Sequence, residues 1–222
     1  MSDSFYVELS NRLEPLDPEL EEYLDGSELR HRWIFDTVSD RSRAARTNHI
    51  YRSKREQWHE SLEQRDWHKF VTVYERPHRL EGFYYIAREC THEEYWDTLG
   101  FVWMDSENIW QNIETWQELW NCERPSKSSS MNEHERKVLA SLPRELSIYR
   151  GFTEGRVEGM SWTLDRDVAV RFAQRFGGIA AVAVAHAKKD DVHAFFDERR
   201  EREVVIEKYV LVDQFDLPAR KE

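Results

Sequence analysis

The chain changes its hydrophobic pattern once, at a polar stretch between residues 122 and 133, and this change does most to constrain the fold. The stretch contains Pro125 and three consecutive serines at 128–130, a composition typical of a loop or linker. Before it, apolar residues recur at helical spacing, and after it they gather in short β-type runs around one helix. We therefore expect an α+β fold, with a helical, tryptophan-rich portion at 1–121 packed on a core at 134–222.

The amino-terminal portion carries helix signals and many aromatic residues. Asp17 followed by Pro18 predicts a short helix that runs through Leu24. Ranges 67–74 and 83–87 are apolar but too short to separate strand from helix. Eight of the nine tryptophans lie within 33–120, and at helical spacing such residues are far more often packed core than a ligand site. The strongest helix should follow Ser106 and place four apolar residues on one face: Ile109, Ile113, Trp116 and Trp120.

The pattern of the carboxyl-terminal portion predicts several strands and one helix. Asp165 and Asp167 stand where the positive end of a helix dipole favours acids, and apolar residues recur every four positions up to Phe176. These features predict a helix over 165–176. Short runs of β-branched and other apolar residues predict strands at 146–149, 180–185, 192–196 and 204–212.

Composition limits the class of protein. The 222 residues are 40% apolar and 34% charged, which suits a sizeable globular core and is too apolar for disorder. The longest uncharged stretch, 176–187, falls well short of the roughly 20 apolar residues that a membrane-spanning helix needs. Acids stand where a secretory signal would have a basic patch, and two cysteines cannot form a disulfide framework. We expect a soluble cytoplasmic protein, and the nine scattered histidines predict no metal site.

Charge is distributed unevenly along the chain. The formal net charge of -11 disfavours binding of nucleic acid through bulk charge, because such affinity comes from Lys and Arg that neutralise phosphates. Segment 31–80 is basic, with 11 Lys and Arg against 7 Asp and Glu. Two interpretations stay open for it: a solvated helix surface, or a docking surface for an anionic target.

Two acids in the last third are the first candidates for chemistry. Glu201 and Glu203 are two positions apart at the entry to the strand expected at 204–212, so both carboxylates should point to the same face. Neighbouring carboxylates repel each other, which is useful in an acid/base pair or beside a cationic transition state. The alternative is a pair of solvated acids in a charged loop. The chain has no Walker A loop, no GxGxxG and no HExxH.

The order of three fragments carries a resemblance. They are IYRG ending at Gly151, SWTLDRDVAVRFA beginning at Ser161, and EREVVI beginning at Glu201. An Arg strand, a Ser/Thr strand leading into a helix, and a late Glu-x-Glu strand resemble the R-S-E clade of mono-ADP-ribosyltransferases, in particular bacterial and phage toxin-like members. The resemblance covers about residues 146–212. Segment 101–112 is similar to the helical part that precedes the core in some of these proteins, although it contains no chemical motif.

The resemblance implies a compact split β-sheet core that binds NAD as co-substrate, without a metal. By position, Arg150 would hold the phosphates of NAD, Ser161 would brace the catalytic carboxylate, and Thr163 would support that strand at the NAD site. Glu203 would stabilise the positive charge that develops as nicotinamide leaves, and Glu201 would orient or deprotonate the acceptor. Two aromatic residues occupy the position that recognises the acceptor in relatives, namely Phe195 and Phe196, with core strand residues as the alternative. Trp162 should face away from Ser161.

The activity that the resemblance implies is transfer of ADP-ribose to a macromolecule, either protein or nucleic acid, by a toxin or effector. An antitoxin would be a further expected partner. Two alternatives stay open: an NAD glycohydrolase, in which water replaces the acceptor, and a catalytically inactive nucleotide-binding or interaction module.

Overall fold

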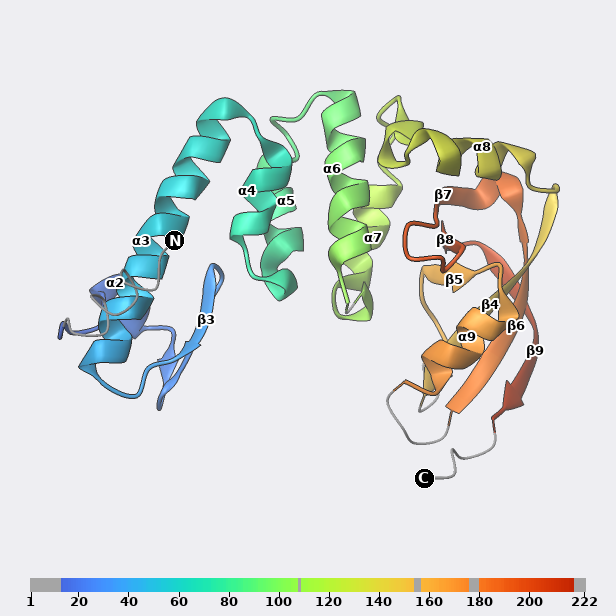
Figure 1. Ribbon diagram of the computed structural model, residues 1–222. Coiled ribbons are helices and arrows are strands. Elements are labelled where there is room, and N and C mark those ends of the chain that lie inside the picture. Colours follow the sequence, from blue (N-terminus) through green and yellow to red (C-terminus); the bar gives the residue numbers. More distant parts are fainter. Residues whose placement is uncertain (1–12, 108, 154–156, 176–179, 218–222) are drawn as a thin grey trace. The chain divides into compact units, whose positions relative to one another are not determined.

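The computed structural model describes residues 13–107, 109–153, 157–175 and 180–217 (Figure 1). Its contacts divide the chain into two compact units: Met1–Cys90 with Asp105–Glu107, and Thr91–Met104 with Asn108–Glu222. The main part of the first unit ends at Cys90. The sequence pattern placed the end of the helical portion later, at residue 121. Most of the residues between 92 and 120 therefore belong to the same unit as the carboxyl-terminal strands.

The first unit combines helices with a small antiparallel sheet. The sheet has the strand order β1-β2-β3, and sequence analysis did not predict it. The helix expected through Leu24 ends at Glu21, and Leu24 opens the first strand instead. The apolar ranges at 67–74 and 83–87 are helical. In chain order the elements are α2 (Pro18–Glu21), β1 (Leu24–Asp25), β2 (Glu28–His31), β3 (Ile34–Thr37), α3 (Arg41–Gln64), α4 (Trp67–Val73), η1 (Arg76–His78) and α5 (Arg79–Ile86).

Local signals explain the long helix α3. The side chain of Asp40 accepts hydrogen bonds from the backbone N–H groups of Ser42 and Arg43, which caps the helix start. The helix ends at Arg65, whose φ of 56° places it in the left-handed region. The next helix, α4, begins directly after Asp66, which caps it in the same way.

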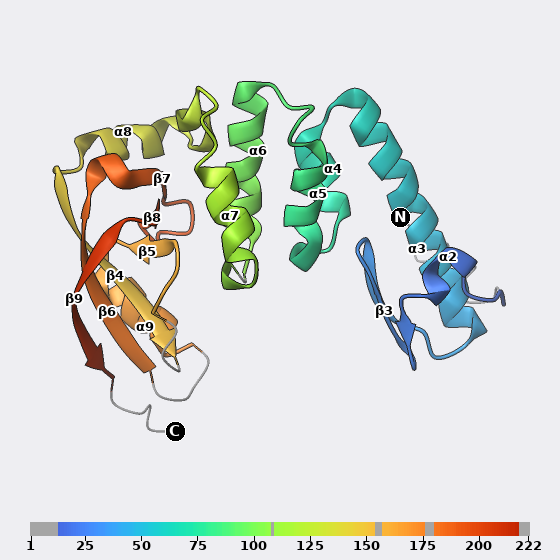
Figure 2. The same ribbon diagram turned by 180° about the vertical axis from the view of Figure 1, so that it is seen from behind.

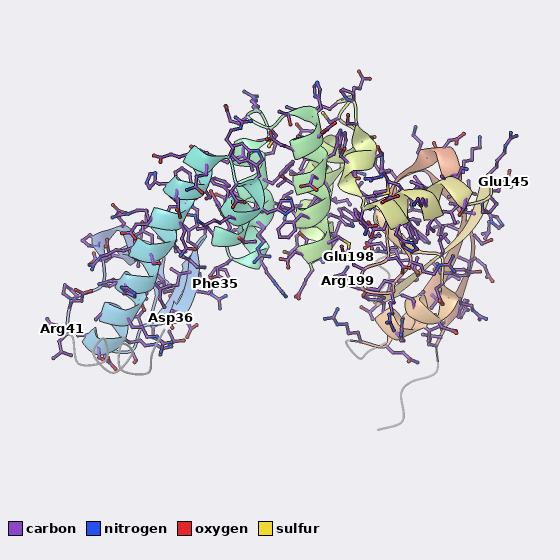
Figure 3. The ribbon with its side chains drawn as sticks, turned by 45° about the horizontal axis from the view of Figure 1, so that its top comes forward. Phe35, Asp36, Arg41, Glu145, Glu198 and Arg199 are labelled. Atoms are coloured by element: carbon purple, nitrogen blue, oxygen red, sulfur yellow. The ribbon has the colours of Figure 1, made fainter. Side chains whose placement is uncertain are left out.

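Many Lys and Arg side chains of segment 31–80 form ion pairs with acidic side chains. Asp36, which Figure 3 labels on β3, forms an ion pair with Arg43. Lys54 Nζ lies 2.8 Å from Glu75 Oε1. Further pairs are Arg32–Glu81, Arg55–Glu19, Lys69–Glu60, Arg76–Glu107 and Arg79–Asp105. This local neutralisation favours the interpretation of the segment as a solvated surface over a docking surface for an anionic target.

The helices of the second unit bury the tryptophans. Four indoles, from Trp96, Trp103, Trp116 and Trp120, are each at most 1% exposed, which confirms the core prediction for these residues, whereas Trp110 is 49% exposed and is not core. The helix expected after Ser106 is divided into a 3₁₀ turn and a short α-helix, and the polar stretch at 122–133 contains another turn. The elements are α6 (His92–Asp105), η2 (Ile109–Asn112), α7 (Ile113–Trp120), η3 (Lys127–Ser130) and α8 (Glu133–Ser141).

A six-stranded antiparallel sheet forms the rest of the second unit. Its strand order is β7-β8-β5-β4-β6-β9. One edge strand, β7, is covered by α8, and the other edge is β9 (Figure 2). The bounds are β4 (Glu145–Thr153), β5 (Ser161–Thr163), α9 (Arg166–Ala173), β6 (Ala180–Lys188), η4 (Lys189–Asp191), β7 (Val192–Phe196), β8 (Glu203–Ile206) and β9 (Tyr209–Asp216). The α+β class is therefore confirmed.

Helix α9 packs against β4 and β6, and a glycine makes this approach possible. A Cβ atom on Gly151 would lie 2.0 Å from the backbone oxygen of Ala169 and 2.5 Å from the backbone nitrogen of Ala173. The helix begins at Arg166, one residue after the predicted start, because Asp165 is its N-cap and its side chain accepts from two backbone N–H groups of the first turn. The helix ends at Ala173 with Gln174 as its C-cap, so it is shorter than the predicted helix, whose expected last residue, Phe176, lies outside the described residues.

The strand expected over 204–212 is two strands. Glu207 and Lys208 separate β8 from β9, and these strands lie at different positions in the sheet. Every residue of β8 is buried because the strand lies between β7 and β5, whereas most of β9 is exposed at the edge. Within the described part of the chain, no helix combines the length and apolarity that a bilayer crossing requires.

Candidate active site

The strand order brings three of the sequence-predicted residues onto neighbouring strands. Arg150 lies on β4, Ser161 opens β5 and Glu203 opens β8, and β5 lies between the other two strands. The register pairs Tyr149 with Thr163 across β4 and β5, and Thr163 with Glu203 across β5 and β8. Residues that are 53 positions apart in the chain, 150 and 203, are thus only two strands apart in space.

Glu203 is the centre of the site. Its Oε1 accepts a hydrogen bond from Ser161 Oγ at 2.5 Å and a second from Trp103 Nε1, on α6, at 3.2 Å. Its Oε2 has no hydrogen-bond partner among the described residues, and Arg199 Nη2 lies 3.6 Å away from it. One carboxylate oxygen is therefore held by two donors, while the other keeps unused acceptor capacity.

Burial raises the pKa of Glu203 above the ordinary value for a glutamate, since only 7% of the residue is exposed. The hydrogen bond from Ser161, the charge of Arg199 and the indole N–H of Trp103 act in the opposite direction. The neighbouring Glu201 adds to the rise through like-charge repulsion. The carboxyl is thus desolvated but surrounded by groups that favour its ionised form.

Arg150 presents an unsatisfied cation beside this carboxylate. Its Nη1 donates to the backbone oxygen of Ser161 at 2.5 Å, and its Nε is buried with no hydrogen-bond partner in the described structure. Burial lowers the pKa of the guanidinium, which nevertheless stays protonated in proteins. A buried, unpaired N–H of a cation is costly unless an anion completes its hydrogen bonding. The residue therefore fits the phosphate-binding role expected for it.

The Thr163 hydroxyl forms hydrogen bonds to backbone groups of the same chain. It donates to the backbone oxygen of Glu201 at 2.6 Å and accepts from the backbone N–H of Asp165 at 3.0 Å. The side chain is buried, so it ties the end of β5 to the segment before β8 and to the start of α9. This arrangement suits the strand-supporting role, because both hydrogen bonds of the hydroxyl join segments of the chain next to β5.

Arg199, which sequence analysis did not single out, joins the two expected acids. Its Nε lies 3.0 Å from Glu201 Oε2, and its Nη2 lies 3.6 Å from Glu203 Oε2. A single guanidinium thus lies within ion-pair distance of both carboxylates. The strand alternation expected to align them is not present, because Glu201 precedes β8 and Arg202, between the two acids, has a left-handed φ. Figure 3 labels Arg199 and its neighbour Glu198 in the turn between β7 and β8.

The turn between β7 and β8 is held in an unusual backbone conformation. Arg200 and Arg202 have φ values of 56° and 45°, in the left-handed region that non-glycine residues seldom adopt. Asp197 anchors the turn, because its Oδ1 accepts from the backbone N–H of Arg202 at 3.0 Å. The backbone N–H of Asp197 itself donates to the buried carboxylate of Glu135, on α8, at 3.0 Å.

The aromatic residues before this turn have a different role from the one expected. Phe195 and Phe196 are 0% and 3% exposed, and Phe196 packs against Trp120. Side chains this deeply buried in β7 cannot contact an acceptor, so the acceptor-recognition assignment is wrong and the core alternative holds. Trp162 is also buried packing, as expected, with its ring 4.5 Å from that of Tyr209.

Trp103 is the second contact that sequence analysis missed. It lies inside segment 101–112, which resembled a known helical part but offered no chemical motif. No local signal separates this tryptophan from the other buried ones, because its distinguishing feature is a bond to a residue 100 positions away.

No protein-family model matches the chain, and no curated protein or solved structure matches it significantly. Among the described residues, no group of three or more His, Cys, Asp or Glu side chains could hold a metal ion.

Proposed function

We propose that the chain is an NAD-dependent mono-ADP-ribosyltransferase that transfers ADP-ribose to a macromolecular acceptor. The observation that carries the proposal is the hydrogen bond from Ser161 Oγ to the buried Glu203 carboxylate, with the unsatisfied guanidinium of Arg150 bound to the backbone of the same serine. These are the three residues of the motif, and they come from three neighbouring strands.

The chemistry of the bond to nicotinamide gives Glu203 its role. Cleavage of a glycosidic bond passes through a transition state that resembles an oxocarbenium ion, and a fixed carboxylate stabilises the positive charge. Ser161 and Trp103 hold Oε1, so Oε2 is the oxygen free to hydrogen-bond a ribose hydroxyl. The desolvated surroundings strengthen this interaction compared with one in water.

Arg150 would bind the phosphates. A planar guanidinium binds phosphate oxygens through directed N–H groups, and its Nε is unpaired and buried in the described structure. The guanidinium also lies within the Coulombic reach of Glu203. The negative phosphates and the positive charge at the reacting sugar would therefore meet groups of opposite sign within one site.

Glu201 is the candidate for activating the acceptor, and its pairing with Arg199 supports a second candidate function. The Glu201 carboxylate already has a partner, because its Oε2 lies 3.0 Å from Arg199 Nε, so it has less free acceptor capacity to offer an incoming acceptor. If the pair persists during the reaction, water would attack in place of an acceptor side chain, and the protein would act as an NAD glycohydrolase. In either case the cellular role would be that of a toxin or effector, and an antitoxin would be a natural partner.

One experiment separates the two activities. Purified protein is incubated with NAD labelled on its adenosine half, with and without cell lysate, beside Glu203→Gln and a Glu133→Gln control on the exposed face of α8. Label fixed on protein or nucleic acid by the wild type and the control alone supports transfer. Free ADP-ribose without fixed label supports hydrolysis. Intact NAD with every variant contradicts both activities.

A further inference from the structure

A helix far from the motif in sequence supplies a direct contact to the proposed catalytic carboxylate. Trp103, on α6, is 1% exposed, and its Nε1 donates to Glu203 Oε1 at 3.2 Å. Ser161 Oγ donates to the same oxygen from β5. Because the two donors come from different elements, together they restrict both the position and the rotation of the carboxyl group.

From this geometry we infer that Trp103 is a positioning residue, which orients Glu203 so that Oε2 faces the substrate. The inference rests on the proposed function, because it assigns Trp103 a part in the same site. The tryptophan acts through Glu203 and is not assigned a contact with NAD or with the acceptor.

An indole N–H is better suited than a hydroxyl to orient the Glu203 carboxylate. Indole N–H is only a donor and does not titrate, whereas the Ser161 hydroxyl can donate or accept. The Trp103 contact is therefore strongest when Glu203 Oε1 carries negative charge. It biases the buried carboxyl toward its ionised form, the form that stabilises an oxocarbenium-like transition state.

Packing fixes the indole in place. The Trp103 ring makes edge-to-face contacts with Trp116 and Trp120 of α7, with centroids 5.0 and 5.7 Å apart. Other buried tryptophans of this core use their N–H differently. Trp96 donates to the backbone oxygens of residues 124 and 125, and Trp120 Nε1 has no hydrogen-bond partner among the described residues. The carboxylate bond thus distinguishes Trp103 from these two neighbours.

The charged and titratable groups that face Glu203 come from two elements. Arg199 and Glu201 lie in the turn before β8, with opposite effects on the pKa of Glu203, and Arg150 lies on β4. None of these groups is altered by a change at Trp103. Loss of the indole donor should therefore raise the pKa of Glu203 further, and the remaining charges should stay as they are.

The test is Trp103→Phe, which keeps an aromatic ring and removes the N–H. Rates of NAD cleavage are measured against pH for this variant, for the wild type and for Trp96→Phe, a matched control that loses an equally buried indole donor. We expect the acid limb of the Trp103→Phe profile to move to higher pH. Its rate should fall about tenfold on that limb, as loss of one hydrogen bond to a charged group implies, and by a smaller but measurable factor above it, where only the lost orientation of Oε2 acts.

A second measurement depends neither on activity nor on the folding of Trp103→Phe. In the wild type, the indole N–H resonance of Trp103 should follow the titration of Glu203, and this pH dependence should vanish in Glu203→Gln. A resonance that does not titrate, or pH profiles that coincide for all three proteins, would overturn the inference. Absence of NAD cleavage by the wild type, together with a titrating indole resonance, would contradict the proposed function while leaving the contact itself established.

Discussion

The guanidinium of Arg150 lies directly against Gly159. A Cβ atom on this glycine would approach Arg150 Cζ and Nη2 to 2.7 Å, much closer than non-bonded contact permits. The backbone of Gly159 also accepts a hydrogen bond from Trp162 Nε1 at 2.9 Å, so the glycine cannot easily move away. The absence of a side chain at position 159 is therefore a condition for the observed placement of Arg150.

We predict that Gly159→Ala weakens NAD binding and leaves the fold intact. The added methyl group meets only the end of a flexible side chain, so Arg150 should shift and the KM for NAD should rise about tenfold, with a smaller change in kcat. Steady-state kinetics check the prediction. In an Arg150→Ala background the same substitution should have little further effect, and additive effects of the two changes would contradict the proposed cause.

Glu203→Gln is expected to stabilise the protein while it removes activity. Because the pKa of the folded-state carboxyl is raised by burial, the folded chain binds more protons than the unfolded chain between the two pKa values, and stability falls as pH rises through that interval. Glutamine has no such dependence. The melting temperature of the variant should exceed that of the wild type at pH 8, with each kcal/mol worth about 2–4 °C, and the gap should close toward about pH 4.

Thermal unfolding followed by circular dichroism at several pH values measures this effect. A Glu133→Gln variant, altered at an exposed acid, is the control and should follow the wild type throughout. A Glu203→Gln protein that is less stable at every pH would show that the carboxylate holds the fold together. The rate of NAD cleavage should fall by about 10³-fold, the size typical for loss of a group that stabilises transition-state charge.

The sequence was sufficient for features that depend on neighbouring residues. Strand β7 has the predicted bounds, 192–196, and α9 begins within one residue of its predicted start at Asp165. The buried tryptophans are core, as their helical spacing indicated. Periodicity and capping act over a few positions, so a single sequence carries this information in full.

Features that depend on pairing between distant segments could not be read in the same way. The run 204–212 looked like one strand, yet β8 and β9 lie at different positions in the sheet, because strand order is set by tertiary contacts. The contact of Trp103 with Glu203 joins residues 100 positions apart and has no local signature either. Arg199 is only four positions from Glu203, yet their contact depends on the conformation of the turn between β7 and β8. Phe195 and Phe196 were misassigned for a related reason, since period-2 patterns do not tell which flank of a strand is covered.

Gly151→Ala should destabilise the second unit severely. Its Cβ would lie 2.0 Å from the backbone oxygen of Ala169, so relief would require α9 to move away from β4. We expect a loss of about 3 kcal/mol or more in the free energy of unfolding, at the upper end for overpacking of a core. Urea denaturation followed by circular dichroism measures it. Gly159→Ala is the matched control, with an expected loss below about 1 kcal/mol, and equal losses would contradict this reading of the two glycines.

The buried carboxylate of Glu135 should hold the turn that precedes Glu203. One of its oxygens, Oε1, accepts from the backbone N–H of Asp197 at 3.0 Å, and the other, Oε2, accepts from the backbone N–H of Asn132 at 2.9 Å in a capping box. Glutamine has one acceptor oxygen in place of two, so Glu135→Gln must leave one of these buried N–H groups without its partner.

We therefore predict that Glu135→Gln lowers the free energy of unfolding by about 1–3 kcal/mol and loosens the turn. Amide hydrogen exchange should become faster at Asp197 or at Asn132, and the rate of NAD cleavage should fall if the turn positions the acids. Glu133→Gln, on the same helix, removes an exposed ion pair with Lys137 and should change stability by less than about 0.5 kcal/mol. Equal effects of the two variants would indicate that the loss of a negative charge in the first turn of α8, and not the buried contacts of Glu135, accounts for the change.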